Sequence, residues 1–117
     1  MWQITMTKTF DNWFSTLGER DRASVLAALM VLREKGPGLP RPWADTVKGS
    51  RYSNMKELRI QSRGDPLRVF FAFDPQRVGI LLCAGSKAGH EKRFYDVMIP
   101  TADREFRHHL HTINNRE

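Results

Sequence analysis

The sequence predicts an α+β fold: a twisted, mostly antiparallel sheet with N-terminal helices packed on one side and a C-terminal helix. Three observations favour this fold class. Apolar residues recur with helical spacing over 20–35, they fill three strand-length segments between 55 and 84, and they return to helical spacing after 100. Short polar turns separate the three segments, as in an antiparallel meander. Because domains typically hold ~100–200 residues, residues 1–117 are expected to form one domain.

The first half is expected to hold a short strand and two helices. Residues 2–7 alternate loosely, as in a strand, and the Asp-Asn pair at 11–12 can start a helix at Trp13. A longer helix is expected over 20–35, where leucine, valine and alanine recur three and four positions apart. The segment 36–43 holds three prolines and two glycines, so we expect an extended connector there.

The second half is expected to hold three strands, over 55–62, 67–73 and 78–84. The last of them is nearly all apolar, which is typical of a central strand that is buried on both faces. Cys83 lies within this strand. We therefore expect it to be a core residue and not a nucleophile.

The chain is expected to end in a helix. Pro100 or Ala102 would begin it, with Thr101 as its cap, because proline and threonine favour these positions at a helix start. Residues 113–117 are expected to fray, as chain ends do.

Charge is the strongest compositional bias. Lysine and arginine number 19 against 13 acidic residues, which gives a net charge of +6, and 13 of the 19 are arginine. The guanidinium presents a planar fork of donors that suits phosphate oxygens. This excess predicts a polyanion or an acidic protein as the partner, with solubility alone as the alternative.

Several classes of protein are excluded. A hydrophobic content of 40% argues against wholesale disorder. The single cysteine rules out an intrachain disulfide and a cysteine-based zinc cluster. No apolar run approaches the ~18 residues of a membrane span, and the first residues do not resemble a signal peptide. We therefore expect a cytoplasmic protein without a membrane partner.

Arg59, Arg68 and Lys87 are the cations that the expected sheet would bring together. Arg68 is the most informative, because it lies inside an apolar strand on the face opposite Leu67 and Val69. Two interpretations remain open for it. It is either aimed at a phosphate or is a structural residue paired with Glu57 or Asp65.

The aromatic and histidine candidates also have two interpretations each. Tyr95 can stack on a base or serve in proton transfer, or it can close the core together with Phe94. His90 is either a proton-transfer group or an exposed loop residue. His108 and His111 share one helix face but lack further ligands, so we expect no metal site.

The order of the motifs resembles the HigB-like, phage Gp49-like branch of the RelE/ParE toxin superfamily. The resemblance covers roughly residues 45–111. It rests on Lys48-Gly49, Glu57-Leu58-Arg59, Leu67-Arg68-Val69, Phe71-Ala72-Phe73-Asp74-Pro75, Gly85-Ser86-Lys87, Phe94-Tyr95 and Ile99-Pro100-x-Ala102-Asp103.

The resemblance implies a small RelE-like toxin of a bacterial type II toxin–antitoxin system. Members with RelE-like activity cut mRNA in the ribosomal A site and need no cofactor or metal. The implied partners are a cognate HigA-like antitoxin with a DNA-binding helix-turn-helix, the 70S ribosome and mRNA.

The resemblance also implies a set of site residues. Arg68 matches the strand arginine that holds the scissile phosphate, while Arg59, Lys87 and Tyr95 match catalytic positions around it. The sequence departs from the RelE pattern at Glu57, where a lysine is usual, and at the alanine that follows Lys87. The residues expected to bind RNA are Lys48, Arg51, Lys56, Arg63, Lys92 and Arg93.

Cleavage of RNA without a metal requires the 2′-hydroxyl to attack the adjacent phosphate. Arg59 and Arg68 suit the stabilisation of the developing charge, and Lys87 is the better proton donor because arginine does not readily release a proton. Two alternatives stay open. The same fold could be a ParE-like toxin that inhibits DNA gyrase without nuclease activity, or an inactive basic binding module.

Overall fold

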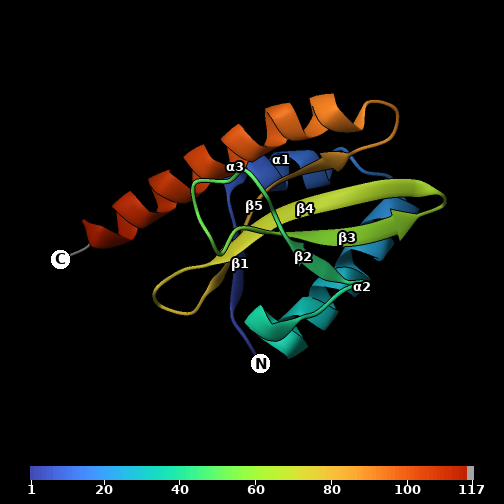
Figure 1. Ribbon diagram of the computed structural model, residues 1–117. Coiled ribbons are helices and arrows are strands. Elements are labelled where there is room, and N and C mark those ends of the chain that lie inside the picture. Colours follow the sequence, from blue (N-terminus) through green and yellow to red (C-terminus); the bar gives the residue numbers. More distant parts are fainter. Residues whose placement is uncertain (116–117) are drawn as a thin grey trace.

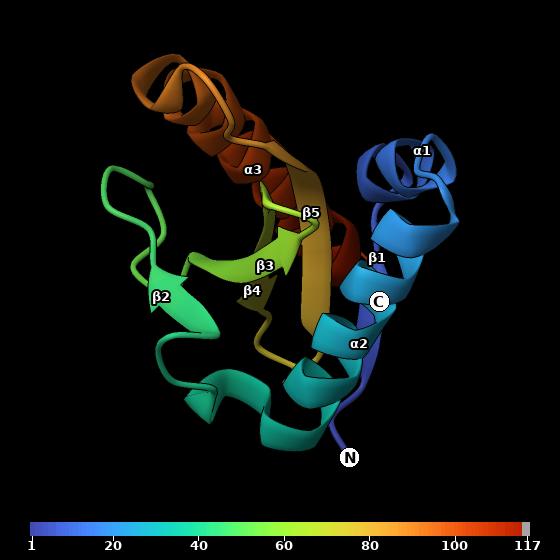
Figure 2. The ribbon, with the colours of Figure 1, turned by 90° about the vertical axis from the view of Figure 1, so that its right-hand side faces the viewer.

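A computed structural model describes residues 1–115. It consists of one sheet between two layers of helices, with α1 and α2 on one face and α3 on the other (Figures 1 and 2). The elements are β1 Ile4–Met6, α1 Lys8–Ser15, α2 Glu19–Lys35, β2 Ala44–Thr46, β3 Lys56–Ser62, β4 Asp65–Phe73, β5 Gly79–Ser86 and α3 Glu91–Asn114.

The sheet has five strands in the order β1-β5-β4-β3-β2. Only the pair β1 and β5 is parallel among the described strands, so the mostly antiparallel sheet expected from the sequence is confirmed. The meander of β3, β4 and β5 is confirmed as well. Its register places Arg59 directly opposite Arg68, and Glu57 opposite Phe70.

Two hydrophobic cores lie on the two faces of the sheet. On one face, Leu58 and Val69 pack against the buried stripe of α2, which includes Leu32. On the other face, Phe70 packs with residues of α3 such as Phe106. Alternation along β3 and β4 therefore points the polar residues Glu57, Arg59 and Arg68 toward the α3 side.

Cys83 belongs to the core beneath α3, where it is 2% exposed. Burial raises the pKa of its thiol to about 12, with a smaller contribution from the charge of Glu105. The expectation of a core cysteine is confirmed, because a buried thiol that stays protonated is a poor nucleophile.

The N-terminal boundaries differ from those expected. The first helix begins at Lys8 and not at Trp13, because the Thr7 hydroxyl caps it by accepting from the Phe10 amide at 3.1 Å. The connector after α2 begins as a 3₁₀ turn over Gly36–Gly38. The short strand β2 was not expected, because three residues are too few to show an alternating pattern in the sequence. It forms by pairing with β3.

The last helix begins at Glu91, well before the expected start at Pro100. Pro100 lies inside α3 and is exposed. Packing of Phe94 and Met98 against the core holds the first turns in helical conformation, so tertiary contacts override the helix-breaking tendency of proline.

The first residues of the expected C-terminal tail belong to α3. Residues 113 and 114 are helical, contrary to the expected fraying, and residues 116 and 117 of that tail lie outside the described residues. No helix within residues 1–115 is both long and apolar enough to cross a membrane.

Candidate active site

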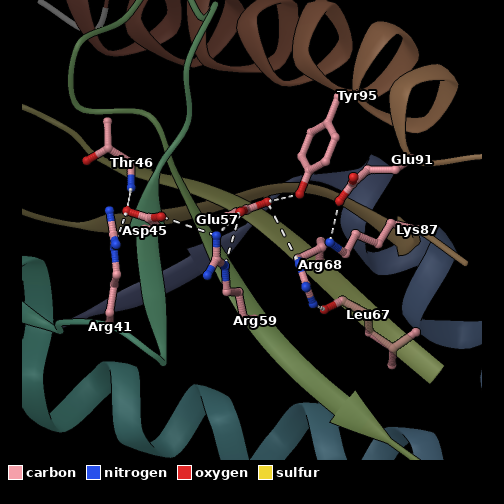
Figure 3. A network of polar contacts seen from close by, with 10 residues as sticks. All are labelled: Arg41, Asp45, Thr46, Glu57, Arg59, Leu67, Arg68, Lys87, Glu91 and Tyr95. Carbon is pink, nitrogen blue, oxygen red and sulfur yellow. Dashed lines mark hydrogen bonds and ion pairs between the residues drawn. The ribbon is translucent and has the colours of Figure 1, made fainter. Parts of the chain in front are cut away.

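Glu57 lies at the centre of a network of polar contacts between the sheet and α3 (Figure 3). Its Oε1 atom accepts a hydrogen bond from the Tyr95 hydroxyl at 2.7 Å. Its Oε2 atom accepts from Nε and Nη2 of Arg59, both at 3.3 Å. Nε of Arg68 is 3.9 Å from Oε1. One carboxylate therefore connects three of the residues that the sequence singled out.

The register of the sheet explains why this carboxylate is needed. Arg59 and Arg68 face each other across β3 and β4, and like charges at directly opposite positions destabilise a sheet. Glu57 is two residues from Arg59 on the same face, so it reaches both guanidinium groups. Asp45 of β2 adds a second contact to Arg59, with Oδ2 3.2 Å from Nη2.

Arg68 is the least accessible cation of the network, with 8% of its surface exposed. Its Nη1 donates to the Leu67 carbonyl at 2.9 Å, while its buried Nε has no hydrogen-bond partner within the described residues. Of the two partners expected for a structural arginine, Glu57 is the one present, since Asp65 accepts from Ser86 instead. The structural interpretation of Arg68 thus has its partner in the structure, with Glu57 3.9 Å away.

Tyr95 closes the core together with Phe94, which is one of the two interpretations that the sequence left open. Its ring packs edge-on against Phe94 and Phe70, with centroid distances of 5.2 Å and 6.1 Å. Burial, followed by the hydrogen bond to Glu57, raises the pKa of its hydroxyl to about 12. The phenol is therefore neutral at physiological pH and acts as a hydrogen-bond donor.

This pKa predicts a measurable pH dependence of stability. The unfolded chain releases the phenol proton at pH ~10, while the folded protein keeps it up to about pH 12, so the stabilisation is present below pH ~10 and is lost as pH rises toward 12. Because Tyr95 is partly exposed, screening limits the effect to ~1 kcal/mol. Urea unfolding between pH 9 and pH 12 measures it, and Tyr95→Phe should lose less stability over that range than the wild type.

Lys87 lies close to this network, in the loop after β5. Its Nζ is 2.6 Å from Oε1 of Glu91 in the first turn of α3, and its amide donates to the Pro66 carbonyl at 3.0 Å. The hydrogen bond and charge of Lys87 lower the pKa of the Glu91 carboxyl. Lys87 is thus paired with the carboxylate of Glu91.

A known protein family matches most of the chain. The family model described as "Phage derived protein Gp49-like (DUF891)" matches residues 12–107. The chain belongs to this Gp49-like family. Two curated relatives from Mycobacterium tuberculosis are named as putative HigB toxins, so the HigB-like resemblance expected from the sequence is confirmed.

The first relative, named Putative toxin HigB2, is 48% identical over 99 residues, which cover 84% of this chain and 49% of that protein. The chain therefore spans about half the length of that relative. Putative toxin HigB3 is 46% identical over 100 residues, which cover 86% of each chain.

Two solved structures share the fold of the Gp49-like protein. A double mutant of the E. coli toxin RelE in the free state has a TM-score of 0.57 at 14% identity, with 80% of this chain and 90% of that chain covered. The toxin–antitoxin complex RelBE2 from Mycobacterium tuberculosis has a TM-score of 0.55 at 16% identity, with coverages of 73% and 96%. The RelE-like α+β architecture expected from the sequence is thereby confirmed.

The Gp49-like protein brings together only some of the residues expected to bind RNA. Lys48 lines a groove beside Glu57, Arg59 and Tyr95. Lys56 does not reach this groove: it alternates with Glu57, so it belongs to the opposite face, and its Nζ donates to the Pro37 carbonyl at 2.8 Å.

The other basic candidates lie at the surface. Lys92 pairs with Asp96 at 3.0 Å, and Arg63 occupies the exposed turn between β3 and β4 with a φ of 53°. Arg51 and Arg93 are exposed. Of these, the structure brings only Arg51 into a depression beside α3.

The histidines of the Gp49-like protein lie apart from the network around Glu57. His90 is exposed before α3, and His108 and His111 are exposed near its end. Within residues 1–115, no three histidine, cysteine or acidic side chains come close enough to hold a metal ion. The fourth histidine, His109, instead binds the buried Asp74, with Nε2 2.8 Å from Oδ2.

Sequence reasoning anticipated only part of the role that acidic residues play in this site. Glu57 appeared as one of two possible partners of Arg68 and as a departure from the family pattern, but its contacts with Arg59 and Tyr95 were not expected. Asp45 carried no signal because strand β2 was not expected. The available clue was that Glu57 and Arg59 are two positions apart in a strand and therefore lie on the same face. A buried carboxylate on the same face as two arginines has to pair with them.

Proposed function

We propose that this protein is the toxin of a bacterial type II toxin–antitoxin system and a metal-independent, ribosome-dependent mRNA endonuclease. One observation carries the proposal. Arg59, Arg68 and Tyr95 converge on the carboxylate of Glu57 beside an open groove. Such a set offers cations for a phosphate, a neutral donor and a proton acceptor in one place.

Substrate binding begins with competition between two anions. A phosphodiester entering the groove displaces the Glu57 carboxylate from Arg59 and Arg68 and takes its place on the guanidinium forks. The buried Nε of Arg68, which has no partner among the described residues, gains an acceptor in this step. An unpaired buried donor costs ~1–3 kcal/mol, so its satisfaction favours the bound state.

The chemical step is an internal transfer of the phosphoryl group. The 2′-oxygen of the nucleotide on the 5′ side attacks phosphorus, and its proton passes to the displaced Glu57 carboxylate. The bond from phosphorus to the 5′-oxygen breaks, and Lys87 donates a proton to that oxygen. The products are a 2′,3′-cyclic phosphate and a 5′-hydroxyl end. Tyr95 orients the substrate through its neutral hydroxyl and its ring.

The ribosome supplies the orientation that these groups lack on their own. In the free protein the cations are neutralised by Glu57, Asp45 and Glu91. Holding the mRNA in an attacking geometry can contribute ~7–11 kcal/mol to a reaction. We therefore propose little activity on free RNA and efficient cleavage of mRNA in the A site.

The proposed partners follow from the family. Two relatives are named as putative toxins, and one structural neighbour is a toxin–antitoxin complex. We propose a cognate HigA-like antitoxin with a helix-turn-helix as the inhibitor of this protein, in the bacterial cytoplasm. The net charge of +6 suits an acidic docking segment on that antitoxin.

Primer extension on programmed 70S ribosomes tests the proposal. The purified protein is expected to produce mRNA ends within the A-site codon when ribosomes are present and none on free mRNA. If the protein cuts free RNA without ribosomes, the proposed dependence on the ribosome is wrong. If no cleavage occurs in either reaction while supercoiling by DNA gyrase is inhibited, the protein is a ParE-like toxin and the nuclease proposal is wrong.

A further inference from the structure

The groove beside Glu57 does not end at the candidate active site. Ile99 of α3 lines both this groove and a second depression next to it. Tyr52, Arg104 and Arg107 line both the second depression and a third one further along the helix. The three depressions therefore adjoin one another along α3, and we refer to them together as the furrow. Its walls are α3 and the loop between β2 and β3, which lie side by side in Figure 1.

The far part of this furrow, defined by Arg51, Tyr52, Arg104, Arg107 and His111, is positively charged. The three arginines are exposed and form no ion pair within residues 1–115. The cations of the candidate site are different, because Arg59, Arg68 and Lys87 each have a carboxylate partner. The far part thus holds positive charge that is available to a ligand.

The single carboxylate that lines the far part is already bound within the protein. Oδ1 of Asp103 accepts from the Ser50 hydroxyl at 2.5 Å, and Oδ2 accepts from the Arg51 amide at 3.0 Å. These bonds attach the loop between β2 and β3 to α3 and keep both walls of the furrow in place. Asp103 therefore holds the shape of the furrow and leaves the charges of Arg104 and Arg107 free.

An aromatic side chain lies between the second and third depressions. Tyr52 packs edge-on against the buried Phe106, with ring centroids 4.9 Å apart, and it remains partly exposed. A ring fixed from behind and open to a basic groove is the usual platform on which a nucleobase stacks. Charge and aromatic surface together match the chemistry of single-stranded RNA.

We propose that the far part of the furrow binds the single-stranded RNA that continues from the scissile phosphate. This inference rests on the proposed nuclease function for its substrate. An α-helix rises ~1.5 Å per residue, so the distance along α3 from Tyr95 to Arg107 and His111 is about 18–24 Å. At ~3.4 Å per stacked nucleotide, this length accommodates about five to seven nucleotides.

Binding of a non-cleavable RNA measures the proposed track directly. The ligand is a fluorescent 2′-O-methyl oligoribonucleotide of about ten nucleotides, followed by anisotropy at several salt concentrations. The double variant Arg104→Gln/Arg107→Gln should bind about ten- to thirtyfold more weakly at 0.1 M salt, with a salt slope smaller by ~1.4, because each phosphate contact on a single strand contributes ~0.7. A three-nucleotide RNA is too short to reach from the candidate site, so its binding should be equal for wild type and variant.

The control removes the same charge from the opposite side of the sheet. Arg20→Gln/Arg33→Gln lies on α2, where both arginines are exposed, and it should bind the long RNA as the wild type does. Equal losses for both double variants would mean general electrostatic attraction and would overturn the proposal. A loss of binding that is seen only with a double-stranded RNA hairpin would also overturn the proposal, because the surface would then bind structured RNA.

The outcome separates this inference from the proposed function. If mRNA is cut on ribosomes but the Arg104→Gln/Arg107→Gln variant binds the long RNA normally, the track is wrong and the nuclease stands. If the variant loses RNA binding but no mRNA is cut on ribosomes, the track stands as an RNA-binding surface and the nuclease function is wrong.

Discussion

Replacing Arg68 with alanine is expected to reduce ribosome-dependent mRNA cleavage by about 10²–10³-fold, the usual effect of removing one donor that stabilises transition-state charge. Arg68 is the buried cation of the network, and its Nε atom has no hydrogen-bond partner within residues 1–115. The phosphate of the substrate would supply that partner. Primer extension with varied toxin concentration gives the rate, and the loss should appear mainly in turnover on ribosome-bound mRNA.

Two further variants keep this experiment interpretable. Removing Arg68 also weakens the environment of Glu57 and costs ~1–3 kcal/mol of stability, so thermal unfolding has to show that the variant is folded at the assay temperature. Arg68→Lys keeps the charge but loses the planar fork, and an intermediate loss of cleavage is expected. Arg33→Ala, on the far side of the sheet, should cut normally. A folded Arg68→Ala protein that cuts like the wild type contradicts the proposed role.

Much of the fold could be predicted because its longer elements carry their own periodicity. The apolar stripe of α2 and the three long strands could be predicted from the sequence, and the structure confirms them within a few residues. Elements that depend on tertiary contacts could not be predicted. Strand β2 exists through its pairing with β3, and the first half of α3 is helical because Phe94 and Met98 pack against the core.

The candidate site was likewise predictable only in part. Alternation along β3 and β4 put Arg59 and Arg68 on one face, which the register then made direct neighbours. Tyr95 was a candidate because of its residue type, and only the resemblance to a family joined it to these arginines, since it lies 27 residues beyond Arg68 in the chain. The sequence offered Glu57 and Asp65 as possible partners of Arg68 but could not decide between them, because the diagonal contact from Glu57 to Arg68 depends on strand register. Buried acidic residues near predicted cations are thus worth testing as partners.

Glu57→Gln is expected to change binding and cleavage in opposite directions. Glutamine keeps the shape of the side chain but not its charge, so Arg59 and Arg68 lose the anion that competes with a phosphate. Binding of a 2′-O-methyl RNA should strengthen about fivefold, the equivalent of ~1 kcal/mol for the loss of one competing charge. Cleavage should fall by about 10²–10⁴-fold, the usual contribution of a general base. A purely structural Glu57 would not separate these two effects.

Asp45→Asn provides the matched comparison. It removes the other carboxylate that contacts Arg59, with Oδ2 3.2 Å from Nη2, but Asp45 does not contact Arg68 or Tyr95 in the structure described for residues 1–115. Binding of the 2′-O-methyl RNA should therefore strengthen here as well, while cleavage should not fall. If both variants lose cleavage to the same degree, Glu57 acts only by holding Arg59 in place. In that case the proton of the 2′-hydroxyl has to leave by another route, and a base outside this chain, on the ribosome, becomes the remaining candidate.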